Sequence, residues 1–504
     1  MNRKSKHGII KRSSVLYLAL AFLFMTWLFQ PLSSLIYLVF HRGVPASVWK
    51  TLTIISYVCY ILTGPSTFKP KAVALIFFMY LSIIISLTLR LFFLDTGTFL
   101  IESLSYYIGL LTISGIFAGV GFPVKYRYVL IERYLFNSLT IIAIPLYSIG
   151  VAQFVTQKPL FIETTLLSLG IDINSAIKIW EFFGRTRAFS LFLSTGYFVM
   201  FINLLFLISV SMLLVSENFR AKIKALVITI ISGVVLYMTQ TRVGYVQLLV
   251  GTITVGLLYY SRKHRWLGVG RIIGVVLIVS IGIIMITLYM AMNEPAQIEE
   301  RPDLLNPASL QIRTSNWDKI LNSISINQFN FWFGNLLFSN NIMIGLGQIS
   351  KYADPDSIIV DNGYMALFMF GGLLFTIITT FAMIISSYKI LGLARDIWSP
   401  VAIGFAAYIT SIVLANFYGS FWDQFALGVA GFFAIYDWSK SSTIPRIPRE
   451  RLSFERATEE SSTTVHTSHG RLSVEGTRER SFPGGHGGDP RGRALRKKDN
   501  WWLL

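Results

Sequence analysis

Residues 189–215 have the sequence FSLFLSTGYFVMFINLLFLISVSMLLV, which contains no charged side chain. A helix needs about 20 consecutive apolar residues to cross the ~30 Å hydrocarbon core of a bilayer, and this stretch is long enough. The run is continuously apolar and lacks the alternation of polar and apolar residues that marks the strands of a membrane barrel. It therefore predicts a transmembrane helix.

The same pattern recurs along the whole chain. The 504 residues are 53% hydrophobic and only 14% charged, against about 25% charged in soluble domains. The predicted fold class is all-α: a polytopic membrane helix bundle of about twelve transmembrane helices. The predicted spans are 15–40, 47–63, 72–91, 98–120, 134–152, 189–215, 224–241, 244–260, 272–291, 363–387, 399–416 and 421–437.

Charge sets the expected orientation. Basic clusters such as SENFRAKIK and SRKHRWLGVGR fall in alternate connections, and short basic loops stay on the cytoplasmic side of a membrane. We therefore expect a multi-pass protein of the cytoplasmic (inner) membrane with both termini in the cytoplasm. The expected regions are a cytoplasmic N-terminal arm (1–14), nine helices (15–291), a large outer loop (292–362), three helices (363–437) and a disordered cytoplasmic tail (438–504).

Composition also excludes several classes of function. The net charge of +18 is explained by anchoring to the inner leaflet, so the expected partner is the lipid bilayer and not nucleic acid. Cys59 is the single cysteine, which excludes an internal disulfide and a cysteine-based metal site. We expect no metal and no other cofactor.

Three arginine-bearing segments share the predicted outer side: FFGRTRAFSLF with Arg185 and Arg187, TQTRVGYV with Arg242, and SLQIRTSNWDKIL with Arg313. The planar guanidinium fork binds phosphate through two charge-assisted hydrogen bonds. The first pair has an alternative role as interface anchors, and loop arginines such as Arg313 are common. Arg242 lies in a short polar break between two spans, where a charge is costly unless it faces water or an anion. The pattern predicts a phosphorylated, lipid-linked substrate.

The end of the large loop offers a candidate base. Asp361 and Asn362 precede the span at 363–387, where either residue type also suits the N-cap of a helix. Asp361 is our candidate for orienting or deprotonating an acceptor hydroxyl, with Asp318 in reserve. Trp317 begins an amphipathic segment in which apolar residues recur at helical spacing.

These motifs together resemble the O-antigen polymerase and ligase superfamily. The resemblance covers roughly residues 185–375 by motif and implies a membrane glycosyltransferase of polysaccharide biosynthesis (O-antigen, lipopolysaccharide or capsule). Such an enzyme moves a glycan from undecaprenyl pyrophosphate onto an acceptor sugar at the outer face of the membrane. By position, Arg187 and Arg242, with Arg185, would bind the pyrophosphate, and Arg313 would occupy the matching loop position. Trp317 and Asn362 are expected to support the site, and a chain-length regulator and a flippase are the candidate protein partners.

One departure favours a polymerase. Ligases of this superfamily carry a histidine beside the asparagine at the end of the loop, whereas this chain has Asp361 there and no histidine between residues 292 and 362. The alternatives are an O-antigen ligase, another lipid-linked glycan transferase, or a flippase or transporter of lipid-linked sugars. A transporter usually places ionisable residues near the middle of the membrane, which the predicted spans lack.

Overall fold

The chain divides into two units, residues 1–443 and 444–504, and all that follows concerns the first. The structure, a computed structural model, describes residues 18–44, 46–62, 67–68, 120–121, 128–168, 181–182, 185–192, 195–263, 268–293, 331–332, 362–418 and 421–436.

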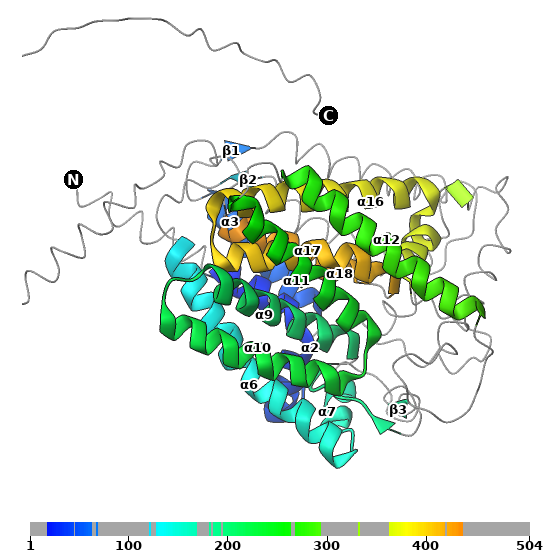
Figure 1. The fold of residues 1–504 in the computed structure, drawn as a ribbon. Helices are drawn as coiled ribbons and strands as arrows, with labels where there is room; N and C mark the ends of the chain where they lie inside the picture. Colours follow the sequence, from blue (N-terminus) through cyan, green and yellow to red (C-terminus); the bar gives the residue numbers. More distant parts are fainter. Residues whose placement is uncertain are drawn as a thin grey trace, which may run out of the picture. The chain divides into compact units, whose positions relative to one another are not determined.

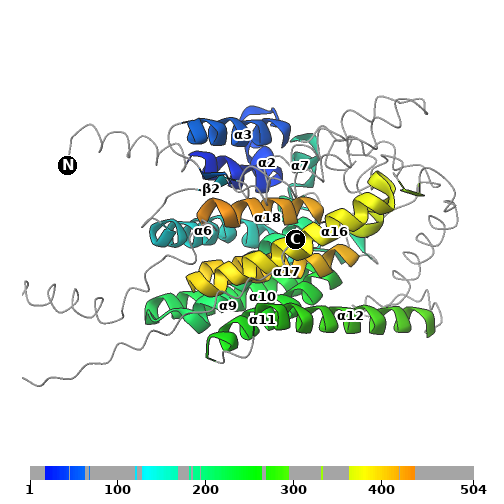
Figure 2. The same cartoon turned by 90° about the horizontal axis from the view of Figure 1, so that it is seen from above.

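The described part is helical and confirms a polytopic membrane protein (Figures 1 and 2). Seven of its helices are long and apolar enough to cross a membrane, or eight if one bent pair counts as a single span. The helices with printed bounds are α2 (Phe29–Phe40), α3 (Ala46–Leu62), α6 (Tyr128–Thr156), α7 (Ile162–Ser168), α9 (Thr195–Val215), α10 (Phe219–Thr239), α11 (Arg242–Lys263), α12 (Val269–Asn293), α16 (Gly363–Ile397), α17 (Pro400–Tyr418) and α18 (Trp422–Ile435).

The count of about twelve spans stays a prediction. The predicted spans 72–91 and 98–120 lie outside the described residues. The predicted spans 47–63 and 421–437 appear as the shorter helices α3, of 17 residues, and α18, of 14 residues. At 1.5 Å per residue, α18 is about 21 Å long and falls short of the ~30 Å hydrocarbon core.

The first predicted span, 15–40, is broken, which corrects the expectation of one continuous helix. A helix over Leu18–Trp27 meets α2 at an angle of 90°. The cause is Pro31, because a proline ring clashes with the carbonyl four residues earlier, and that carbonyl belongs to Trp27. The break is held from outside: the Trp27 indole N–H donates to the Gln424 side chain of α18, and the Thr26 and Thr53 hydroxyls lie 3.0 Å apart.

α9 packs against α10, α11 and α17 (Figure 1). α9 and α17 are mostly buried, whereas α10 and α12 are mostly exposed. Glycines permit the close packing: a Cβ added to Gly404 of α17 would lie 2.5 Å from the Ile208 backbone of α9. Small residues at such contacts are the usual means by which membrane helices approach one another.

Two short antiparallel ladders join connecting segments. β1 (Thr67–Phe68) pairs with β2 (Val120–Gly121), and β3 (Glu181–Phe182) pairs with β4 (Arg185–Thr186). The first ladder brings residues 120–121 beside residues 67–68. The second forms a hairpin that places Arg185 directly opposite Phe182.

Candidate functional site

The segment that carries Arg187 is held by Gln153, in the last turn of α6, and by Gln157, the residue that follows this helix. The Gln153 side chain is fully buried and its amide is fully used. Its oxygen accepts from the backbone N–H groups of Phe189 (3.1 Å) and Ser190 (2.7 Å), and its nitrogen donates to the carbonyls of Leu160 (2.8 Å) and Ser190 (2.9 Å). One turn later, the Gln157 side chain accepts from the backbone N–H of Thr186 at 3.0 Å.

The same segment is tied to the end of α10, which brings two of the predicted arginines to one corner of the bundle. The backbone N–H of Ala188, the residue after Arg187, donates to the Met238 carbonyl at 3.2 Å. Met238 lies in the last turn of α10, and Arg242 is the first residue of α11. Arg187 and Arg242 are both half-buried. The backbones of these two motifs are therefore close together, and the side of the membrane on which they lie stays a prediction.

The first turn of α11 is held in place by contacts with α9 and α10. Asn203 of α9 is fully buried and donates both to the Gly244 carbonyl (3.1 Å) and to the Gln247 side chain (2.7 Å). A Cβ on Gly244 would meet Val199 and Leu236 at 2.7 Å, so three helices converge under Arg242. A charged group placed on such a rigid element keeps a defined position.

The position of Arg242 favours an anion as its neighbour. The N-terminus of a helix carries a partial positive charge that attracts anions and disfavours cations. An arginine in the first turn of α11 adds to this positive potential instead of compensating it. The combination is electrostatically unfavourable in isolation and favourable when a phosphate is bound.

Strained backbone is concentrated at this end of the bundle. Gln157, Phe161, Ser190 and Gln240 all have positive φ angles between 49° and 63°, a region that residues other than glycine seldom adopt. Such conformations cost of order 1–3 kcal/mol each and cluster at functional sites. Within the described residues, two further non-glycine residues share this conformation, His41 and Trp398.

Asn362, the last residue of the predicted large loop, is buried and caps α16. Its side-chain oxygen accepts from the backbone N–H groups of Tyr364 (2.9 Å) and Met365 (3.2 Å), which confirms the capping interpretation for this residue. Phe331, within the large loop, packs edge-on against Phe368 of α16, with ring centroids 5.6 Å apart.

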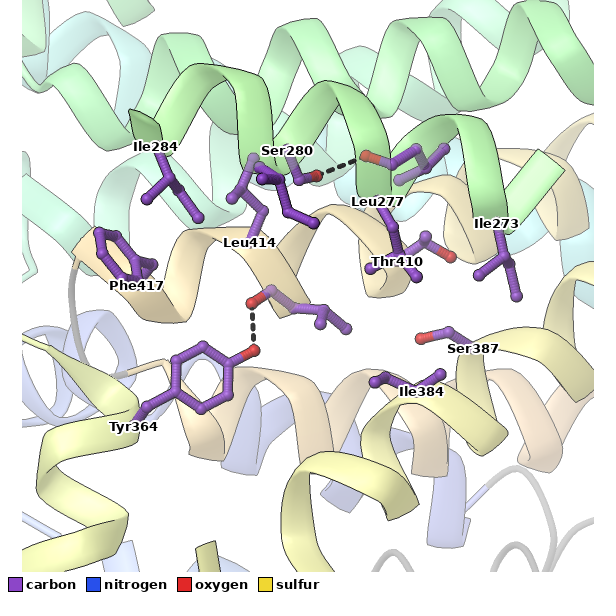
Figure 3. Close-up of a pocket in the computed structure, with 13 residues that line it drawn as sticks. Ile273, Leu277, Ser280, Ile284, Tyr364, Ile384, Ser387, Thr410, Leu414 and Phe417 are labelled. Carbon is purple, nitrogen blue, oxygen red and sulfur yellow. Dashed lines mark hydrogen bonds between the residues drawn. The ribbon is translucent and has the colours of Figure 1, made fainter. Parts of the chain in front are cut away.

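A cavity of about 130 Å³ lies next to this cap, between α12, α16 and α17 (Figure 3). Tyr364 closes it by donating from its hydroxyl to the Val413 carbonyl at 2.5 Å. The hydroxyls of Ser280 and Thr410 are bonded to carbonyls of their own helices. The cavity is therefore largely apolar.

Four predicted site residues have no described side chain: Arg185, whose backbone forms β4, and Arg313, Trp317 and Asp361, which lie outside the described residues. Sequence analysis missed Gln153, Gln157, Asn203 and Gln247. An amide inside an apolar span is costly to bury and is a signal that would have found Asn203 and Gln247. In the part of the chain that the structure describes, no group of histidine, cysteine, aspartate or glutamate side chains has the arrangement of a metal site.

Comparison with known families decides the class. Residues 225–380 match the family model described as O-antigen ligase. These residues form an O-antigen ligase family domain. The domain runs from α10 into α16 and includes Arg242, Arg313, Asp361 and Asn362, whereas Arg185 and Arg187 precede it. No curated protein matches the chain. The family match confirms the resemblance seen in the sequence for residues 225–380 and indicates lipid-linked glycan transfer of the polymerase or ligase type.

Proposed function

We propose that the protein is a polymerase of lipid-linked oligosaccharide repeat units. It transfers a growing glycan from undecaprenyl pyrophosphate to the terminal sugar of another lipid-linked unit. The observation that carries this proposal is the backbone hydrogen bond from Ala188 to Met238, which holds the Arg187 segment beside the start of α11. Two half-buried arginines at one corner suit a pyrophosphate leaving group.

The chemistry follows from the leaving group. The oxygen of the acceptor hydroxyl bonds to the anomeric carbon of the donor sugar while the bond from that carbon to the pyrophosphate oxygen breaks. The negative charge that develops on the pyrophosphate is stabilised by Arg187, Arg242 and the N-terminus of α11. The hydroxyl proton passes to Asp361, acting as general base. Inversion at the anomeric carbon is expected from the family resemblance alone.

The distribution of charge supports an outer position for this site. The end of the bundle opposite Arg242 carries the start of α10, the end of α11 and the start of α12. Its basic residues include Arg220, Lys222, Lys224, Arg262, Lys263 and Arg271. Cytoplasmic ends of spans are enriched in Lys and Arg, so this end faces the cytoplasm. The opposite end, which holds Arg187 and Arg242 and is called the arginine corner below, faces outward.

The absence of a histidine in residues 292–362 favours the polymerase over a ligase. The test is reconstitution of the full chain in liposomes with undecaprenyl-pyrophosphate-linked repeat units as both donor and acceptor. A polymerase produces a ladder of glycans differing by one repeat unit. A product formed only when a different lipid acceptor, such as a lipid A core, is added contradicts the polymerase and supports the ligase.

A further inference from the structure

A second, larger hollow lies away from the arginines, along the side of the bundle. It is an apolar groove of about 540 Å³ between α6 and α10, with the fully buried Leu205 of α9 at its base. α6 lines it from Thr140 to Thr156, a length of about 24 Å at 1.5 Å per residue. The groove therefore extends over most of the ~30 Å depth of a hydrocarbon core.

The polar groups in the lining are already occupied. The Tyr147 hydroxyl pairs with Ser232 at 2.9 Å. The hydroxyls of Thr140, Ser148 and Thr156 each donate to a carbonyl four residues earlier on α6, at 2.6–2.9 Å. The groove consequently presents hydrocarbon to an occupant, although several of its residues are polar.

One end of the groove meets the arginine corner. Val155 and Thr156, which line it, lie in sequence between Gln153 and Gln157, the two residues that hold the backbone of residues 186–190. The helices are close here: a Cβ on Gly150 would lie 2.9 Å from the Phe198 ring and 3.6 Å from the Ala188 side chain. A molecule lying in the groove thus has its end next to the segment that carries Arg187.

We propose that this groove binds the polyprenyl chain of the donor while its pyrophosphate is held by Arg187 and Arg242. The inference rests on the proposed function, which supplies the pyrophosphate. Its volume falls within the 300–1,000 Å³ usual for small-molecule sites, whereas the cavity at Tyr364 is below that range. The charge of the arginine corner selects a chain that ends in pyrophosphate over the acyl chain of an ordinary phospholipid.

The test uses a sugar-free polyprenyl pyrophosphate with a photoreactive group in its chain, added to the full-length protein in phosphatidylethanolamine–phosphatidylglycerol nanodiscs. We expect crosslinks in residues 140–156 and 228–235. Unlabelled polyprenyl pyrophosphate should compete for them, and added phosphatidylglycerol should not. Equal competition by phosphatidylglycerol would overturn the proposal, because the groove would then hold ordinary lipid.

Two matched pairs of variants separate the groove from the rest of the lipid-facing surface. Ile144→Trp on α6 and Ile231→Trp on α10 narrow the groove. Ile141→Trp and Ile230→Trp change residues of the same type on the same helices that do not line it, with similar exposure. We expect the groove variants to weaken competition by polyprenyl pyrophosphate about tenfold or more and the controls to behave as the unchanged protein. Equal losses in both sets would refute the groove.

The groove and the proposed function fail in different ways. Normal repeat-unit ladders from Ile144→Trp and Ile231→Trp, together with crosslinks outside the groove, would refute the groove and leave the polymerase standing. Specific crosslinks in the groove without any glycan ladder would support the groove and contradict the polymerase.

Discussion

At the scale of single residues, Arg242 combines features that seldom occur together. It begins a helix whose dipole already favours anions, it is half-buried, and its helix is fixed to α9 through Asn203. Lysine at this position keeps the charge and loses the bidentate fork, whereas glutamate reverses the charge where an anion must bind.

Arg242→Lys should therefore retain part of the polymer yield, and Arg242→Glu should abolish polymer while the protein still reaches the membrane. Polymer length and yield on gels, normalised to the amount of membrane protein, provide the measurement. Arg220→Glu is the matched control, because Arg220 is exposed at the opposite end of α10. Polymer of normal yield from Arg242→Glu would rule out a role in pyrophosphate binding.

Asp361 can be separated from its neighbour because Asn362 supplies the cap of α16. Asp361→Asn should leave the melting temperature unchanged while polymer synthesis falls by ~10²–10⁴-fold, the usual contribution of a general base. Asn362→Asp tests the cap alone and should leave the melting temperature unchanged, since either residue caps a helix equally well. A fully active Asp361→Asn enzyme would remove Asp361 from the mechanism.

At the scale of elements, the position of the segment that carries Arg187 depends most on Gln153. Its amide satisfies four backbone groups in two connecting segments, and each buried backbone group left unpaired costs about 1–3 kcal/mol. Gln153→Leu keeps a similar size and removes all four bonds. The segment that carries Arg187 then loses its anchor to α6.

We expect Gln153→Leu to lower both the melting temperature in detergent and the polymer yield. Gln157→Leu, which loses one side-chain bond to Thr186 and one to the Phe154 carbonyl of α6, should cause a smaller change in both. The order of the two variants is the critical result. A larger effect from Gln157→Leu would show that the corner is held elsewhere.

The elements also show what sequence alone can predict. Continuous apolar runs placed most described helices correctly, because burial in lipid demands that pattern. The break at Leu28 was missed because hydropathy does not register Pro31, which lies three residues after Leu28 within the apolar run. The arginines were singled out because placing a charge in lipid is costly. Gln153 was not singled out, because it lies near the end of a span, where a polar residue carries little signal.

At the scale of the whole molecule, the orientation follows from charge and is open to direct measurement. In a Cys59→Ser background, cysteines introduced at Ser315 and Ser357 should react with an impermeant maleimide from outside, because the large loop is expected there. A cysteine at Ser441 should react only after permeabilisation. Reaction of the cysteine at position 441 in intact cells would contradict the expected orientation or the expected number of spans.

The contact between Trp27 and Gln424 joins the first described helix to the last described one, across 397 residues of chain. Ribosomes add about 5–20 residues per second, so the indole is made roughly 20–80 s before its partner. During that interval the bend at the end of the first segment lacks this contact, although the Thr26–Thr53 pair can already form. Complete packing of the amino-terminal region therefore has to wait until α18 has been made, and a chain truncated before α18 should be recognised by membrane proteases as unfinished.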